Sequence, residues 1–109
     1  MSQWHLVMRC QRLYLRWRIR SDEIFLLKAA MLKARGEGLR LNLEGDEVLY
    51  PNGVDLTRGE IVLPRAADDS VEIGPLVAFV VDWHPKIARR WLENRERLAA
   101  LDSGVECQG

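Results

Sequence analysis

Residues 39–50 read LRLNLEGDEVLY, and this stretch decides the centre of the fold. Apolar side chains alternate with polar ones before Gly45-Asp46, a dipeptide typical of two-residue hairpin turns, and a short apolar run follows it. We therefore predict a β-hairpin in which Leu43 lies opposite Val48. Its buried face would carry Leu39, Leu41, Leu43, Val48 and Tyr50. Its other face would carry Arg40, Asn42, Glu44, Glu47 and Leu49.

The segment before the hairpin carries the clearest helix signals in the chain. Ser21 can cap the first free backbone amides, and Asp22 and Glu23 would lie at the positive end of the helix dipole. Gly36 stands where helices commonly end on a glycine in the left-handed conformation. We predict a helix over residues 22–35 that is apolar on nearly every side. Such a helix needs cover from the sheet and from a second element, and we expect that element to be a second copy in a homodimer.

The first twenty residues fit both the period of a strand and the period of a helix. As a strand, residues 12–20 alternate without a fault, with Leu13, Leu15, Trp17 and Ile19 on one face. The opposite face would then hold Arg12, Tyr14, Arg16, Arg18 and Arg20. As a helix, the same residues form two apolar stripes on opposite sides. We favour a basic strand over residues 1–20, with a bulge near Gln11.

Beyond the hairpin, residues 60–63 predict a short strand and residues 85–101 a helix ended by Ser103-Gly104, with residues 105–109 frayed. Residues 75–83 stay open, because their β-branched content favours a strand whereas Gly74-Pro75 is a helix start. The expected fold class is α+β: one small domain over residues 1–104. Its centre is a β-hairpin or small antiparallel sheet, with one helix before it and one or two helices after it.

The charges are segregated along a chain whose formal net charge is zero. Residues 1–40 hold nine basic and three acidic side chains, whereas residues 41–82 hold two basic and nine acidic ones. The two halves could pair within the fold, or present a basic and an acidic surface to different partners.

Candidates for catalysis and metal binding are few. Asp82 and His84 could act as acid and base in a pocket, but a capping carboxylate and a structural imidazole account for them better. His5, Cys10 and Cys107 have no neighbour at metal-ligand spacing. We expect no enzymatic activity, no cofactor and no metal.

The longest apolar run, residues 76–81, is far shorter than the roughly 18 residues that a membrane span requires. Arginines interrupt the N-terminal segment from Arg9 onward, which argues against a signal peptide. We expect a cytoplasmic protein without membrane contact.

Two longer stretches carry a family resemblance. KARGEGLRLNLEGDEVLYPNG at residues 33–53 and DWHPKIARRWL at residues 82–92 resemble the N-terminal docking domain of tubulysin-type nonribosomal peptide synthetase subunits. The resemblance covers residues 22–92, and the chain adds residues 1–20 and an insertion around 60–73. It implies an α-β-β-α-α core, dimerisation through helices, and a hairpin face that accepts a partner's peptide at Arg40, Asn42 and Leu49.

The expected function is therefore that of a small docking or adaptor protein that binds a partner protein or peptide as a homodimer. Its partner-binding residues would be Arg40, Asn42, Leu49, Glu44 and Glu47. The alternative is a nucleic-acid-associated accessory protein of a phage, plasmid or other mobile element. In that case the basic strand face, Arg12, Tyr14, Arg16, Arg18 and Arg20, would contact phosphates and stack on a base. Glu44, Asp46, Glu47 and Asp55 could instead imitate nucleic acid.

Overall fold

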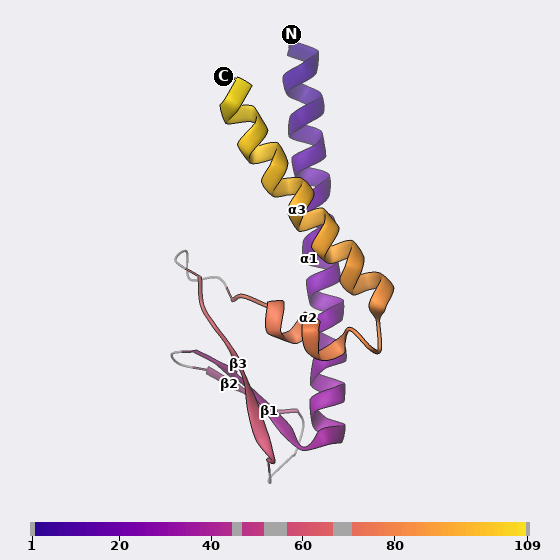
Figure 1. The fold of residues 1–109 in the computed structure, drawn as a ribbon, viewed down its shortest axis with the longest axis vertical. Helices are drawn as coiled ribbons and strands as arrows, with labels where there is room; N and C mark the ends of the chain where they lie inside the picture. The colour runs from indigo at the N-terminus through magenta and orange to yellow at the C-terminus, as the bar shows by residue number, and fades with distance from the viewer. Residues whose placement is uncertain (1, 45–46, 52–56, 67–70, 109) are drawn as a thin grey trace.

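The computed structural model describes residues 2–44, 47–51, 57–66 and 71–108. One long helix leads into a three-stranded sheet, and two helices follow it (Figure 1). This confirms the expected α+β class, with one helix before the sheet and two after it. The elements are α1 (Ser2–Glu37), β1 (Leu39–Leu43), β2 (Glu47–Leu49), β3 (Gly59–Leu63), α2 (Gly74–Val80) and α3 (Pro85–Gln108).

Helix α1 runs for 36 residues without a break, so the prediction of a basic strand over residues 1–20 is wrong. Leu15 and Ile19 are four residues apart and both are buried, because the helical period brings them to the same side. Leu13 and Trp17, which share their strand face in the alternating pattern, are exposed instead. Ser21, read as a helix start, lies in the middle of α1.

The end of α1 also differs from the prediction. Gly36 lies inside the helix, and the left-handed residue is Gly38, with φ at 68°. The Gly38 amide donates to the Arg35 carbonyl, and the Gly38 carbonyl accepts a hydrogen bond from the Arg58 amide. The turn from helix to sheet therefore depends on Gly38.

The sheet has the order β2-β1-β3 and is mixed, because β1 pairs antiparallel with β2 and parallel with β3. Strand β3 confirms the strand predicted for residues 60–63. The hairpin register differs from the prediction by one residue: Leu43 lies opposite Glu47 rather than Val48. Since a one-residue shift turns each side chain to the other face, Leu49 points inward, and Val48 and Tyr50 are exposed. The predicted turn residues 45 and 46 lie outside the described residues.

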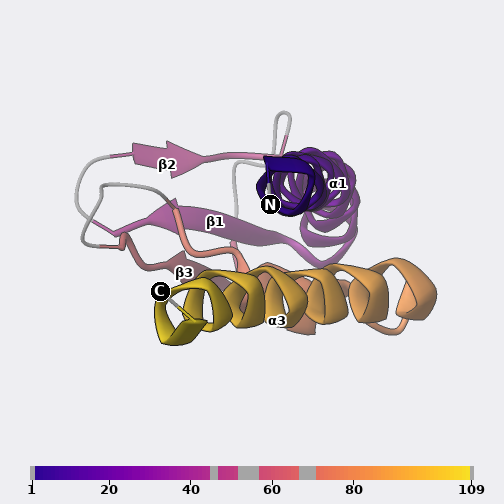
Figure 2. The ribbon, with the colours of Figure 1, turned by 90° about the horizontal axis from the view of Figure 1, so that it is seen from above.

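The core lies between the sheet and the helices on one side of it. Figure 1 shows α1 and α2 beside the sheet and α3 across α1, and Figure 2 shows α1 end-on beside the sheet. The most deeply buried large side chains come from α1, β1, β3 and α2: Leu26, Leu41, Leu63, Leu76 and Val80. The hairpin is thus one part of a core that α1 and α2 complete.

Residues 75–80, which the sequence leaves open, belong to helix α2. Pro75 occupies the first turn, and the Gly74 amide donates to the Glu72 carboxylate at 3.1 Å. The Val80 carbonyl accepts hydrogen bonds from the amides of Trp83 and His84, both at 3.0 Å. The helix start at Gly74-Pro75 therefore outweighs the β-propensity of the apolar run.

The N-terminal part of α1 and the C-terminal part of α3 extend together beyond the sheet as a two-helix arm, shown at the top of Figure 1. Arg12 joins them, with Nε 3.3 Å from the Asp102 carboxylate. Helix α3 continues to Gln108, so the expected end at Ser103-Gly104 and the frayed tail are wrong for residues 105–108. In a two-helix arm each helix is covered on one side only, so its other side stays exposed.

Among the described residues, no helix is both long and apolar enough to cross a membrane.

Candidate interaction surfaces

The side of α1 that faces away from α3 carries large apolar side chains in solvent. Trp17 is 60% exposed, Leu13 59% and Ile24 49%. With about 3.6 residues per turn, these three side chains fall on one side of the helix. Four exposed cations lie on the same side, and we call the whole set the α1 face: Arg9, Leu13, Arg16, Trp17, Arg20, Ile24 and Lys28.

Asp22 and Glu23, the acidic residues of α1 before Glu37, both bond to side chains of α3. Asp22 is 3% exposed, and Arg90 of α3 binds its carboxylate. Glu23 accepts a hydrogen bond from Nε1 of Trp91 at 3.1 Å. Since Asp22 and Glu23 both serve the contact with α3, no carboxylate of α1 before Glu37 is exposed. The charges on the α1 face are therefore all positive.

Two other cations of α1 are held by internal contacts. Arg12 donates to the Leu101 carbonyl at 3.4 Å and lies beside Asp102. Lys33 donates from Nζ to the Phe79 carbonyl at 2.6 Å and lies 4.6 Å from the centre of the Phe79 ring. These two cations fasten α1 to α3 and to α2, and they are not part of the α1 face.

The helix divides the predicted nucleic-acid-binding set. Arg12, Arg16 and Arg20 follow at four-residue spacing and share one side of α1, whereas Arg18 lies on the far side. Tyr14 is turned away from these arginines, but its ring centre lies 6.3 Å from that of Trp17. The prediction that these five residues form a single surface is wrong, because it depended on the strand period of two. Arg16 and Arg20 remain exposed beside Trp17, which the sequence reading had assigned to the opposite face.

The predicted hairpin face is present only in part. Arg40 and Asn42 lie on the outer side of the sheet, and both donate to the same Glu60 oxygen, at 2.9 and 3.3 Å. Hydrogen bonds with Tyr50 and then with Glu60 raise the pKa of the Arg40 guanidinium. The polar groups of Arg40 and Asn42 are thus already engaged with Glu60 of β3.

The other predicted hairpin residues lie elsewhere. Leu49 is opposite Leu41 and packs against the core, on the other side of the sheet from Arg40. Glu44 is exposed, and its carbonyl accepts a hydrogen bond from Arg65 at 3.2 Å. The side chain of Glu47 lies outside what the structure describes. The register therefore separates Leu49 from the predicted binding face and puts Val48 and Tyr50 there.

A second apolar surface lies between α2 and α3. It is a groove of about 630 Å³, and we call it the α2–α3 groove. Its lining residues are Gly74, Val77, Ala78, Val81, Pro85, Ala88, Arg89, Trp91 and Leu92. Leu92 is 51% exposed and Val81 40%. The sequence leaves residues 75–83 open between strand and helix, so it could not predict a groove formed by α2 and α3.

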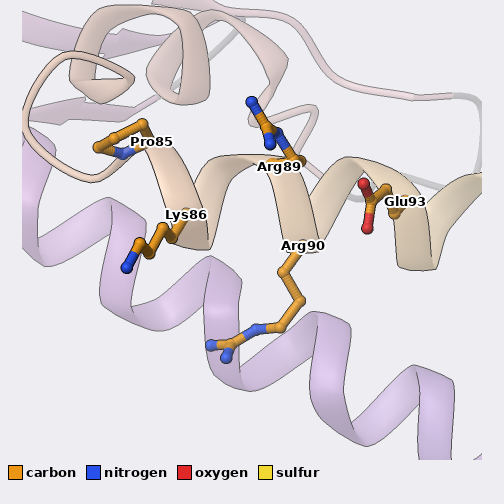
Figure 3. A pocket seen from close by; sticks show the side chains of 5 residues that line it. All are labelled: Pro85, Lys86, Arg89, Arg90 and Glu93. Atoms are coloured by element: carbon orange, nitrogen blue, oxygen red, sulfur yellow. The ribbon is translucent and has the colours of Figure 1, made fainter.

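Another hollow, of about 350 Å³, lies at the start of α3 and is lined by Pro85, Lys86, Arg89, Arg90 and Glu93. Figure 3 shows Lys86 and Arg90 extending toward α1, whereas Arg89 points away from it. The hydrogen bonds from Arg90 to Asp22 raise the pKa of the Arg90 guanidinium. Arg90 is therefore already engaged by a buried carboxylate and joins α3 to α1.

His84, the candidate base, makes contacts that stabilise the fold. Its ring packs edge-on against Phe25, with ring centres 4.8 Å apart. The backbone carbonyl of His84 accepts a hydrogen bond from the Ala88 amide. Asp82 is exposed on the turn before it. Across the described ranges, no three His, Cys, Asp or Glu side chains come together as a metal site would require.

No protein-family model, no curated protein and no solved structure matches this chain. The resemblance to docking domains therefore stays a prediction. A function for the chain is therefore inferred from the geometry of the α1 face, the outer sheet face and the α2–α3 groove.

Proposed function

We propose that the chain is a small non-enzymatic interaction protein, and that its α1 face docks an acidic surface of a partner protein. One observation carries this proposal: Leu13, Trp17 and Ile24 are about half exposed on one side of a long helix, among cations only. A single exposed apolar residue on a protein surface needs no explanation, but a contiguous group of large ones marks an interaction surface.

The composition of the α1 face suits a protein partner. Tryptophan and arginine are the residues that most often carry binding energy at interfaces, and Trp17 stands between Arg16 and Arg20. From residue 9 to residue 28 the face is about 28 Å long, at about 1.5 Å per residue. That length accommodates an amphipathic helix of a partner lying along α1.

The charge of the α1 face favours an acidic partner. Arg9, Arg16, Arg20 and Lys28 would steer a negatively charged surface into contact and oppose a positive one. The α1 face is preferred to the predicted hairpin face because Arg40 and Asn42 are already bonded to Glu60. A partner on the sheet would have to compete with those bonds.

Nucleic-acid association is the second candidate, and one observation favours it. Trp17 lies among exposed arginines on the α1 face, an arrangement in which the ring could stack on a base and the guanidinium groups could bind phosphates. The two candidates differ in what contacts position 17: a protein in the first and a nucleic acid in the second.

Photo-cross-linking from position 17 in native cells tests the proposal. A photoreactive amino acid replaces Trp17 in the full chain, and in a matched control it replaces Val48 on the outer sheet face. We expect one discrete protein adduct from position 17, lost when Arg16→Glu and Arg20→Glu are combined.

The other outcomes contradict the proposal in different ways. A nuclease-sensitive adduct would favour the second candidate. An adduct from position 48 alone would return the site to the hairpin face, and an adduct of twice the chain's mass from position 17 would make the α1 face a self-association surface.

A further inference from the structure

Helix α3 presents a stripe of exposed residues on the side that faces away from α1. Successive members are four, three, four, three and four residues apart, which keeps them on one side of a helix. All six are exposed, and we call them the α3 stripe: Pro85, Arg89, Leu92, Glu96, Ala99 and Ser103. Leu92, at the centre of the stripe, is 51% exposed and also lines the α2–α3 groove.

We propose that a second copy of the chain covers the α3 stripe and the α2–α3 groove. The two α3 helices would lie antiparallel about a twofold axis at Leu92. A twofold interface uses the same patch on both copies, so the patch must be complementary to itself. The α3 stripe meets this condition in both charge and size.

The charges select the antiparallel arrangement. Arg89 comes three residues before Leu92, and Glu96 four residues after it. With the axis at Leu92, Arg89 of each copy lies within one residue, about 1.5 Å along the helix, of the position opposite Glu96 of the other, so two ion pairs can form. A parallel arrangement would instead oppose Arg89 to Arg89 and Glu96 to Glu96, and like charges in contact disfavour it.

The apolar residues fit the same arrangement. Leu92 meets its own copy at the axis, beside Val81 of the groove. Pro85 lies opposite Ala99 of the other copy, whose small side chain lets the helices approach. From residue 85 to residue 99 the contact is about 21 Å long, at about 1.5 Å per residue. The second copy thus removes from water the apolar lining of a groove of about 630 Å³.

The same reasoning excludes the α1 face as the dimer contact. Its exposed charges are Arg9, Arg16, Arg20 and Lys28, so two copies would bring cations together in either orientation. The dimer interface therefore leaves the α1 face free for a different partner. It does not depend on the function proposed for that face.

Sedimentation analysis of the full chain tests the dimer, with a monomer mass of 12.6 kDa as the reference. We expect a reversible dimer. Arg89→Glu and Glu96→Arg should each weaken it roughly tenfold, because each change breaks two symmetric pairs. The double variant should restore it, since the exchanged charges pair again. Arg97→Glu is the matched control: it makes the same substitution at an exposed position of α3 outside the stripe, and should change nothing.

Cysteine cross-linking locates the axis. In a Cys10→Ser and Cys107→Ser background, Leu92→Cys should form a disulfide-linked dimer under mild oxidation, and Trp17→Cys should not. A strict monomer at every concentration would overturn the proposal. So would a dimer that neither charge reversal weakens, or a cross-link through position 17 in place of position 92.

Discussion

Arg90 of α3 donates two hydrogen bonds to Asp22 of α1, from Nε to Oδ2 at 2.9 Å and from Nη2 to Oδ1 at 2.7 Å. Asp22 is 3% exposed, whereas the Arg90 side chain is 42% exposed. The carboxylate thus depends on Arg90 for its charge compensation, while the guanidinium keeps access to water. This pair joins residues 68 positions apart and holds the two long helices in one alignment.

Removing Arg90 should therefore lower the free energy of unfolding more than removing Asp22. Arg90→Ala leaves a buried carboxylate without its cation, and we expect it to lower the free energy of unfolding by about 2 kcal/mol. Asp22→Ala frees a guanidinium that can reach solvent, and should cost about 1 kcal/mol. Urea unfolding of both variants, with Lys86→Ala as an exposed control on the same helix, measures the difference. Equal costs would contradict the assigned burial.

Two neighbouring residues of α1 separate stability from binding. Leu15 is 2% exposed, so Leu15→Ala should cost about 3 kcal/mol through the cavity it leaves. Trp17 is 60% exposed, so Trp17→Ala should change the free energy of unfolding by no more than about 0.5 kcal/mol. Thermal unfolding of the two variants checks this. A large loss with Trp17→Ala would mean that the chain itself covers the α1 face.

The two glycines at the end of α1 should respond in opposite directions. Gly36 lies inside the helix with open space around it, so Gly36→Ala should stabilise the protein by up to about 1 kcal/mol. Gly38 has φ at 68°, so Gly38→Ala should destabilise it by about 1 kcal/mol. Unfolding by denaturant measures both changes. The reverse order would place the end of the helix at Gly36.

The Glu72 carboxylate gives stability a dependence on pH. Hydrogen bonds from Arg95 are the main cause that lowers its pKa from the ordinary value of 4.5. Since the folded-state pKa is the lower one, this contribution is present above pH 4.5 and is lost as the pH falls below that value. Both side chains are partly exposed, so Glu72→Gln should cost less than about 1 kcal/mol at neutral pH.

Denaturant unfolding of the wild type and Glu72→Gln over a series of acidic pH values tests this dependence. We expect the difference between the two proteins to shrink as the carboxylate becomes protonated. A difference that stayed constant through this range would show that the Glu72 carboxylate is not the source of the pH dependence.

Much of the fold could be read from local sequence signals. The apolar positions of residues 39–43, the short strand at residues 59–63 and the helix that begins at Pro85 all follow from neighbours within a few residues. The candidate surfaces could not be read in this way. The α1 face depends on which side of a long helix α3 covers, and the groove depends on α2.

The sequence by itself determined the alternating strand at residues 39–43 and the helix that begins at Pro85, because proline and side-chain period act on the adjacent backbone. Only the tertiary structure decided the conformation of residues 1–20, since Leu15 and Ile19 satisfy both periods until α3 buries one side of the helix. It also decided the hairpin register and the role of Asp22, whose partner Arg90 is far along the chain. Burial depends on segments that are distant in the sequence, and no local pattern contains that information.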